Sequence, residues 1–128
     1  MSPRVDLELS PRLDDLGAVA KKARAAIDGG AQVVLRVPVN AHSYRRLPDI
    51  VRWVDDRLSG IAGLDFTHDD AHPARTAPDF HAWWVSTRHA CEVREVGCLI
   101  TGELPGAPGP GLRPPRPEPR PEPHPELL

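Results

Sequence analysis

Two cysteines are among the side chains of this sequence best suited to chemistry. Cys91 and Cys98 lie seven residues apart, a spacing that matches no standard zinc motif. A thiol can carry sulfur or act in redox chemistry, and positive neighbours such as Arg88 and His89 favour the reactive thiolate. The alternative interpretation is that both cysteines are small, buried hydrophobic residues.

Histidine and aspartate side chains form a second group with chemical potential. His68, Asp70 and His72 lie in a polar stretch that ends at Asp79, and His81 follows nine residues after His72. Imidazole and carboxylate groups are suitable ligands for zinc or another transition metal, so a metal site is one interpretation of this group. Because the stretch has the composition of a loop, a solvated loop without a metal is the alternative.

The adjacent Trp83 and Trp84 mark a candidate contact surface. If the segment 81–87 is a strand, successive side chains point to opposite faces, and one indole must face away from the core. Exposed tryptophan often dominates protein interfaces. The sequence therefore predicts a protein partner at these tryptophans and the open face of the sheet, with a homodimer as the first case. The alternative is that the segment 91–100 folds over the outward indole and buries it.

The elements that must position these residues follow from apolar periodicity. The predicted strands are 5–9, 32–39, 61–67 and 81–87, and the predicted helices are 13–27 and 47–58, the latter starting as early as Ser43. Ser10 suits a helix N-cap and Pro11 the first helical position. The segment 91–100 is either a fifth strand or irregular, because its alternation breaks near Arg94.

This order, β-α-β-α-β-β, predicts an α/β two-layer sandwich over residues 1–103. Right-handed crossovers would place both helices on one face of a mixed sheet and leave the other face to solvent. Residues 104–128 differ in kind, since ten of the 16 prolines lie between Pro105 and Pro125. Such a segment cannot bury a core, so we expect a disordered Pro-rich tail, either solvated or acting as a docking peptide.

Three places in the sequence carry a family resemblance. Ser10-Pro11-Arg12-Leu13 stands at the first strand-to-helix junction, Gly29-Gly30 ends the first helix before the 33–37 strand, and the polar run 43–50 leads into the second helix. In this arrangement the chain resembles the TusA/SirA-like sulfur-carrier family, whose junction reads Cys-Pro-x-Pro. In that family the cysteine holds a persulfide, and a helix N-terminus suits a thiolate.

The resemblance implies an accessory module that binds a partner. Ser10 stands where the family has its cysteine, and a hydroxyl cannot hold sulfane sulfur, so we expect no sulfur relay at that position. One alternative is a sulfurtransferase or persulfide carrier that uses Cys91 or Cys98. A second alternative is a metal-binding protein that uses the loop from His68 to His81.

Composition excludes several other classes. The 128 residues carry a formal net charge of -2, which gives no electrostatic pull toward nucleic acid. No apolar run approaches the roughly 20 residues of a membrane span, and the N-terminus lacks the apolar core of a signal peptide. Two cysteines argue against a disulfide framework and for a reducing cytoplasm, and the arginine-rich composition is typical of a high-GC bacterium. We expect no cofactor, because the sequence has no Gly-rich phosphate loop.

Overall fold

The computed structural model describes residues 3–69, 71–102, 104 and 111–112, in which strands and helices alternate. The strands are β1 (Arg4–Glu8), β2 (Gln32–Val39), β3 (Gly63–His68) and β4 (Cys98–Thr101). The α-helices are α1 (Leu16–Asp28), α2 (Leu47–Arg57) and α3 (Phe80–Arg94). Two short 3-10 turns, η1 (Tyr44–Arg46) and η2 (Ala74–Thr76), precede α2 and α3. The predicted α/β class is confirmed.

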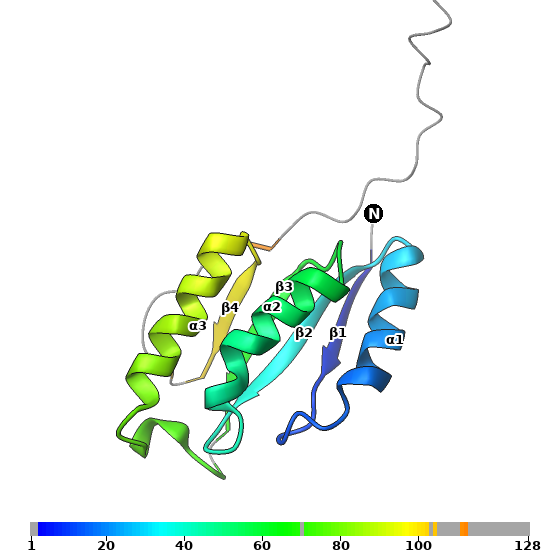
Figure 1. Cartoon of the computed structure of the whole chain (residues 1–128). Coiled ribbons are helices and arrows are strands. Elements are labelled where there is room, and N and C mark those ends of the chain that lie inside the picture. The colour runs from blue at the N-terminus through cyan, green and yellow to red at the C-terminus, as the bar shows by residue number, and fades with distance from the viewer. Residues whose placement is uncertain (1–2, 70, 103, 105–110, 113–128) are drawn as a thin grey trace, which may run out of the picture.

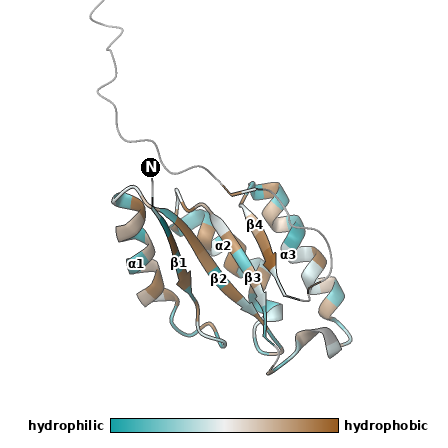
Figure 2. Ribbon diagram, turned by 180° about the vertical axis from the view of Figure 1, so that it is seen from behind, coloured by the Kyte–Doolittle hydropathy of each residue, from teal (hydrophilic) through white to brown (hydrophobic). Residues whose placement is uncertain are grey.

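The four described strands form one parallel sheet in the order of the chain, β1-β2-β3-β4. Figure 1 shows α1, α2 and α3 on one side of this sheet, and Figure 2 shows the opposite side, where no helix of the described chain lies. Right-handed crossovers between neighbouring parallel strands produce this arrangement, since each places its helix over the same face.

The core fills the space between the sheet and the helices. Alternate residues of β2 point toward the helices, and all four are fully buried: Val33, Leu35, Val37 and Val39. The helices contribute the apolar positions spaced three and four apart: Val19, Ala23 and Ile27 from α1, and Leu47, Ile50, Val51 and Val54 from α2. The sequence pattern of these two helices and of β2 therefore predicts their buried faces correctly.

The fourth predicted strand is wrong, because the segment 81–87 lies within the helix α3. The predicted β-α-β-α-β-β order and mixed sheet are therefore also wrong. The buried residues of α3 are Phe80, Trp84, Thr87 and Cys91, which follow the helical period. Apolar side chains on the outer face of α3 obscure that period in the sequence. A helix also suits this segment, because parallel strands need a long crossover between them, which is usually a helix.

Only the end of the segment 91–100 is a strand. Cys91 lies in the last turn of α3, and β4 begins at Cys98. The helix ends at Glu95, whose φ of 55° is left-handed, and the Val96 amide donates to the Cys91 carbonyl at 2.9 Å. A left-handed residue with this bond is a common helix C-terminus. The break in alternation near Arg94 thus marks a helix end.

The first helix starts later than predicted. α1 begins at Leu16, and residues 10–15 form a loop in which Leu13 has a φ of 58°. This left-handed conformation is unfavourable for a residue with a Cβ. The Leu13 side chain is 1 % exposed, so its burial in the core holds the loop in this conformation. The predicted N-cap at Ser10 and first helical position at Pro11 are therefore wrong, because both residues precede the helix by a full loop.

Most of the predicted tail, 104–128, lies outside the described residues. Of its described residues, Leu104 packs against the core and Leu112 lies against the start of β3. A Cβ at Gly63 would lie 2.8 Å from Leu112 Cδ2, and a Cβ at Gly97 would lie 2.9 Å from Leu112 Cα. Because Gly63 and Gly97 have no side chain, Leu112 can lie against the chain at the starts of β3 and β4.

Candidate functional site

The carboxyl edge of the sheet brings together three loops that are distant in sequence. The strands are parallel, so the loops that follow β1, β2 and β3 all leave the sheet at this edge, and the three helices begin there (Figure 1). In open α/β sheets, ligands bind outside the carboxyl ends of the strands. This edge is therefore the first place to look for a site.

Asn40 connects these loops. It directly follows β2, is fully buried, and its side-chain oxygen accepts from the backbone amides of His42 and Ser43, both at 2.8 Å. Its side-chain nitrogen donates to the Pro11 carbonyl at 2.8 Å and to Asp69 Oδ2 at 3.3 Å. One amide group thus joins the loop after β2 to the loops after β1 and β3.

Ser43 completes the turn after β2 and is also fully buried. Its hydroxyl donates to the Pro38 carbonyl at 2.6 Å and accepts from the Asn40 amide at 3.0 Å. The side-chain oxygen of Asn40 and the hydroxyl of Ser43 both have hydrogen-bond partners within the protein, as buried polar groups require. The turn is therefore a rigid support for the exposed residues around it.

Replacing Asn40 with alanine should lower the free energy of unfolding by about 2 kcal/mol, because the His42 amide and the Pro11 carbonyl lose a partner and the buried Ser43 amide keeps only its longer bond to the Asn40 carbonyl at 3.2 Å. Urea unfolding measures the change. Asn40→Asp keeps the acceptor but loses the donor, and places a second carboxyl beside Asp69. Its loss should therefore exceed that of alanine above the pKa of the new carboxyl. Unchanged stability in Asn40→Ala would contradict the connecting role.

Ser10 lies in the loop between β1 and α1 and is not the N-cap of the helix. Its hydroxyl donates to Asp14 Oδ1 and accepts from the Asp14 amide at 3.1 Å, while its own amide donates to Asp15 Oδ1 at 3.0 Å. These bonds close the loop ahead of α1, whose N-cap residue is Asp15. Ser10 therefore stabilises a loop at the carboxyl edge, beside Pro11 and its bond from Asn40.

The structure separates the predicted metal ligands and introduces another histidine. His68 ends β3, His81 lies exposed in the first turn of α3, and Asp70 lies outside the described residues. His72, in the loop after β3, instead lies beside His42, with 5.1 Å between the ring centroids. Within the described residues, no three His, Cys, Asp or Glu side chains are grouped to hold a metal ion. The spacing of residues in the sequence does not predict the contact between His42 and His72, because the two histidines are thirty positions apart.

An ionic contact ties η1 to the start of α3. The Tyr44 hydroxyl donates to Asp79 Oδ1 at 2.5 Å, and Arg45 Nη2 lies 2.8 Å from Asp79 Oδ2. The hydrogen bond from Tyr44, together with Arg45, lowers the pKa of Asp79, and the same bond raises the pKa of Tyr44. Asp79 therefore stays ionised and holds η1 against the start of α3 at the carboxyl edge of the sheet.

Cys91 and Cys98 lie together inside the protein. Both are free thiols and at most 1 % exposed. A hydrogen bond with Cys98 and burial both raise the pKa of Cys91, which keeps the thiol protonated. A sulfur carrier needs the opposite, an accessible thiolate. The arrangement fits the interpretation of two small buried residues better than that of a sulfur handle.

Trp83 and Trp84 have different environments because they lie on a helix. Trp84 is 2 % exposed, stacks on Phe80 and meets the Phe66 ring edge-on at 5.4 Å between centroids. Trp83 is 36 % exposed. The predicted surface role therefore applies to Trp83 alone, and Trp84 belongs to the core.

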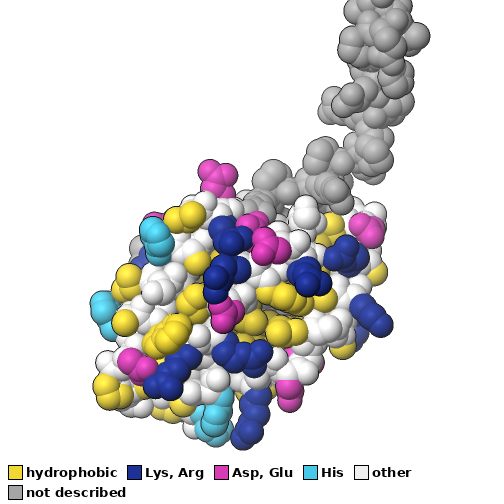
Figure 3. All heavy atoms as spheres, viewed as in Figure 1, with side chains coloured by type: hydrophobic (Ala, Val, Ile, Leu, Met, Phe, Trp, Pro, Cys, Tyr) yellow, Lys and Arg dark blue, Asp and Glu magenta, His cyan; other side chains and the backbone are white. Residues whose placement is uncertain are grey.

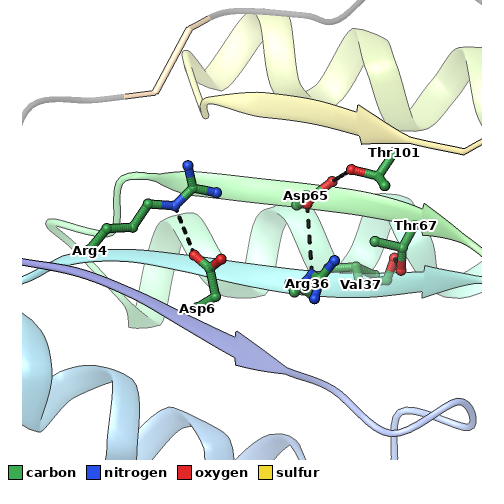
Figure 4. A network of polar contacts seen from close by, with 7 residues as sticks. All are labelled: Arg4, Asp6, Arg36, Val37, Asp65, Thr67 and Thr101. Atoms are coloured by element: carbon green, nitrogen blue, oxygen red, sulfur yellow. Dashed lines mark hydrogen bonds and ion pairs between the residues drawn. The ribbon is translucent and has the colours of Figure 1, made fainter.

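The helix-free face of the sheet carries paired charges (Figure 4). Arg36 Nε lies 3.8 Å from Asp65 Oδ2, and Thr101 donates to Asp65 Oδ1 at 2.8 Å, so this carboxylate bridges β2, β3 and β4. At the edge, Arg4 pairs with Asp6 at 2.9 Å. Asp65 is nearly buried despite its position on this face. The carboxylate stabilises the sheet through these contacts and does not point to a ligand.

One hollow on the helical side lies between α1 and α2. Figure 3 shows hydrophobic side chains on its floor and Lys and Arg side chains around it. Near the helix ends it narrows to a pocket of about 250 Å³, which is lined by Arg24, Ile27, Asp28, Asp56, Arg57, Leu58 and Ser59. Arg24 donates to the Arg57 carbonyl across it. The charges in this pocket are of both signs, which favours no single class of ligand.

Comparison with known proteins gives no relative: no family model, no curated protein and no solved structure matches this chain. Within the described part of the chain, no helix has the length and apolar character needed to cross a membrane. The function must therefore be argued from the site and the surface alone.

Proposed function

We propose that this protein is a protein-binding module that carries out no sulfur relay, and that the outer face of α3 is its contact surface. The outer face of α3 comprises Ala82, Val85, His89 and Val93, and Trp83 lies on another side of the same helix. One observation carries the proposal: the large hydrophobic residues exposed in the described chain, Trp83, Val85 and Val93, all lie on this one helix. Clustered apolar exposure of this kind marks interaction sites.

The state of the candidate sulfur sites supports binding over chemistry. The Ser10 hydroxyl is engaged with Asp14, and the thiols of Cys91 and Cys98 are buried. None of these groups is arranged as an accessible nucleophile. The resemblance to the TusA/SirA-like carriers stays a hypothesis, and it is compatible with an accessory protein of that kind.

A second copy of the chain is the partner that this face fits best. Val85, His89 and Val93 recur every four residues, so they form one stripe along α3. In a two-fold contact, residue i of one copy meets residue j of the other and the reverse. An antiparallel pair of α3 helices centred on His89 would place each Val85 against the Val93 of the other copy. Neither valine carries a charge that would oppose this contact.

Changing Val93 to glutamate should abolish self-association, because the change buries an unpaired charge in the contact. Val93 is 67 % exposed, so the monomer should keep its fold. Sedimentation equilibrium up to millimolar concentration suits the weak dimer that one helix face can support. Ala18→Glu, on the exposed side of α1, is the matched control and should associate like the wild type. A wild type that stays monomeric, or an unaffected Val93→Glu dimer, would refute the contact.

A further inference from the structure

His42 and His72 form a close pair at the carboxyl edge of the sheet. His42 lies in the turn after β2 and His72 in the loop after β3, and both side chains are exposed. Their ring centroids lie 5.1 Å apart, and the ring planes are inclined by 53°. The rings are tilted and solvent-exposed, so burial of apolar surface gives little reason for them to meet.

The separation of the rings suits a shared metal ion. A tetrahedral ion binds imidazole nitrogen at about 2.0–2.1 Å, and each ring centre lies roughly 1.2 Å further out, so two ligating rings have centroids about 5.2 Å apart. The observed 5.1 Å is close to this value. The separation of the two ring centroids therefore fits two imidazoles that share one ion.

The backbone holds the two histidines in place without the metal. The His42 amide donates to Asn40 Oδ1 at 2.8 Å, and the Ala41 amide donates to the His72 carbonyl at 2.8 Å. Asp69, bound by the Asn40 side chain, accepts from the Ala71 amide at 3.0 Å next to His72. Both loops are thus fixed within one residue of each histidine, and this preorganisation lowers the entropy cost of binding.

We propose that His42 and His72 form a surface site for one divalent transition-metal ion of the zinc class. Imidazole ligands favour zinc, nickel and copper over magnesium and calcium, which prefer oxygen. Among the described residues the protein supplies two ligands, and water fills the remaining positions. Such open positions can accept a further ligand from a bound molecule, and an ion held by two protein ligands would be exchangeable. The ion would also link the loop after β2 to the loop after β3.

Titration of the full chain with zinc chloride, followed by thermal unfolding, tests the site. An ion that binds only the folded protein raises its melting temperature. We expect a rise with zinc and none with magnesium chloride, and we expect His42→Ala and His72→Ala each to remove the zinc effect. His81→Ala and His89→Ala alter exposed histidines on α3 and serve as matched controls that should keep it.

Calorimetry then gives the stoichiometry, for which we expect one ion per chain in the wild type. Both histidine side chains are exposed, so we expect His42→Ala and His72→Ala to remain folded. Circular dichroism of the two variants checks this. A wild type whose melting temperature does not change with zinc would overturn the proposal. A zinc effect that survives in both His42→Ala and His72→Ala would also overturn it, because the ion would then bind elsewhere.

Discussion

Replacing Trp84 with alanine should lower the free energy of unfolding by about 3–5 kcal/mol, the usual cost of removing a large buried aromatic side chain. The indole is 2 % exposed and packs between Phe80 of the same helix and Phe66 of β3. Alanine would leave a cavity between α3 and the sheet that these rings could fill only in part. Urea unfolding monitored by circular dichroism measures the loss.

The neighbouring Trp83→Ala is the matched control for this prediction. It removes the same side chain from the same helix, but from a position that is 36 % exposed. We expect a clearly smaller loss than for Trp84→Ala, because more than a third of this residue is already in contact with water and its truncation leaves no closed cavity. Equal losses in the two variants would contradict the burial of Trp84 in the core and the greater exposure of Trp83.

Gly97→Ala should destabilise the protein by about 3 kcal/mol, the upper end for overpacking. A Cβ at this position would lie 2.6 Å from the Ala62 carbonyl oxygen and 2.9 Å from the Gly111 carbonyl oxygen. Both are backbone atoms, one directly before β3 and one in the segment after β4, so no change of rotamer relieves the contact. Thermal unfolding of the purified variant measures the effect.

Gly17→Ala provides the opposite case. Gly17 lies at the start of α1, and a Cβ there meets no atom within 4 Å. Alanine is the better helix former by up to about 1 kcal/mol, so this variant should be as stable as the wild type or more stable. If Gly97→Ala were equally harmless, the close approach of the chain at Gly97 would not exist in solution.

The sequence predicts correctly the elements in which one face is apolar and the other is polar. In β2, and in α1 and α2, apolar and polar residues separate cleanly, and their type follows from periodicity alone. In α3 the pattern fails, because Val85 and Val93 place apolar groups on the outer face as well. Seven residues that alternate by chance then look like a strand, although the positions of Phe80, Trp84 and Cys91 already follow the helical period.

The candidate site is harder to predict because tertiary contacts build it. His72 is recognisable as a potential ligand, but its neighbour His42 reaches it only through the pairing of β2 with β3. Asn40 carries a local signal, since an asparagine directly after a buried strand is typical of a turn. Its bonds to Pro11 and Asp69, each 29 residues away, cannot be read from local pattern.

The strand order also governs how the chain can fold. Among the described residues, each strand pairs with its neighbours in sequence, so none of these four strands has to enter between two that are already paired. The contacts of the sheet therefore span one strand-helix unit at a time, and loop closure costs little entropy at each step. A chain emerging from the ribosome can thus add each unit to the growing sheet as it appears, in the manner of a repeat protein.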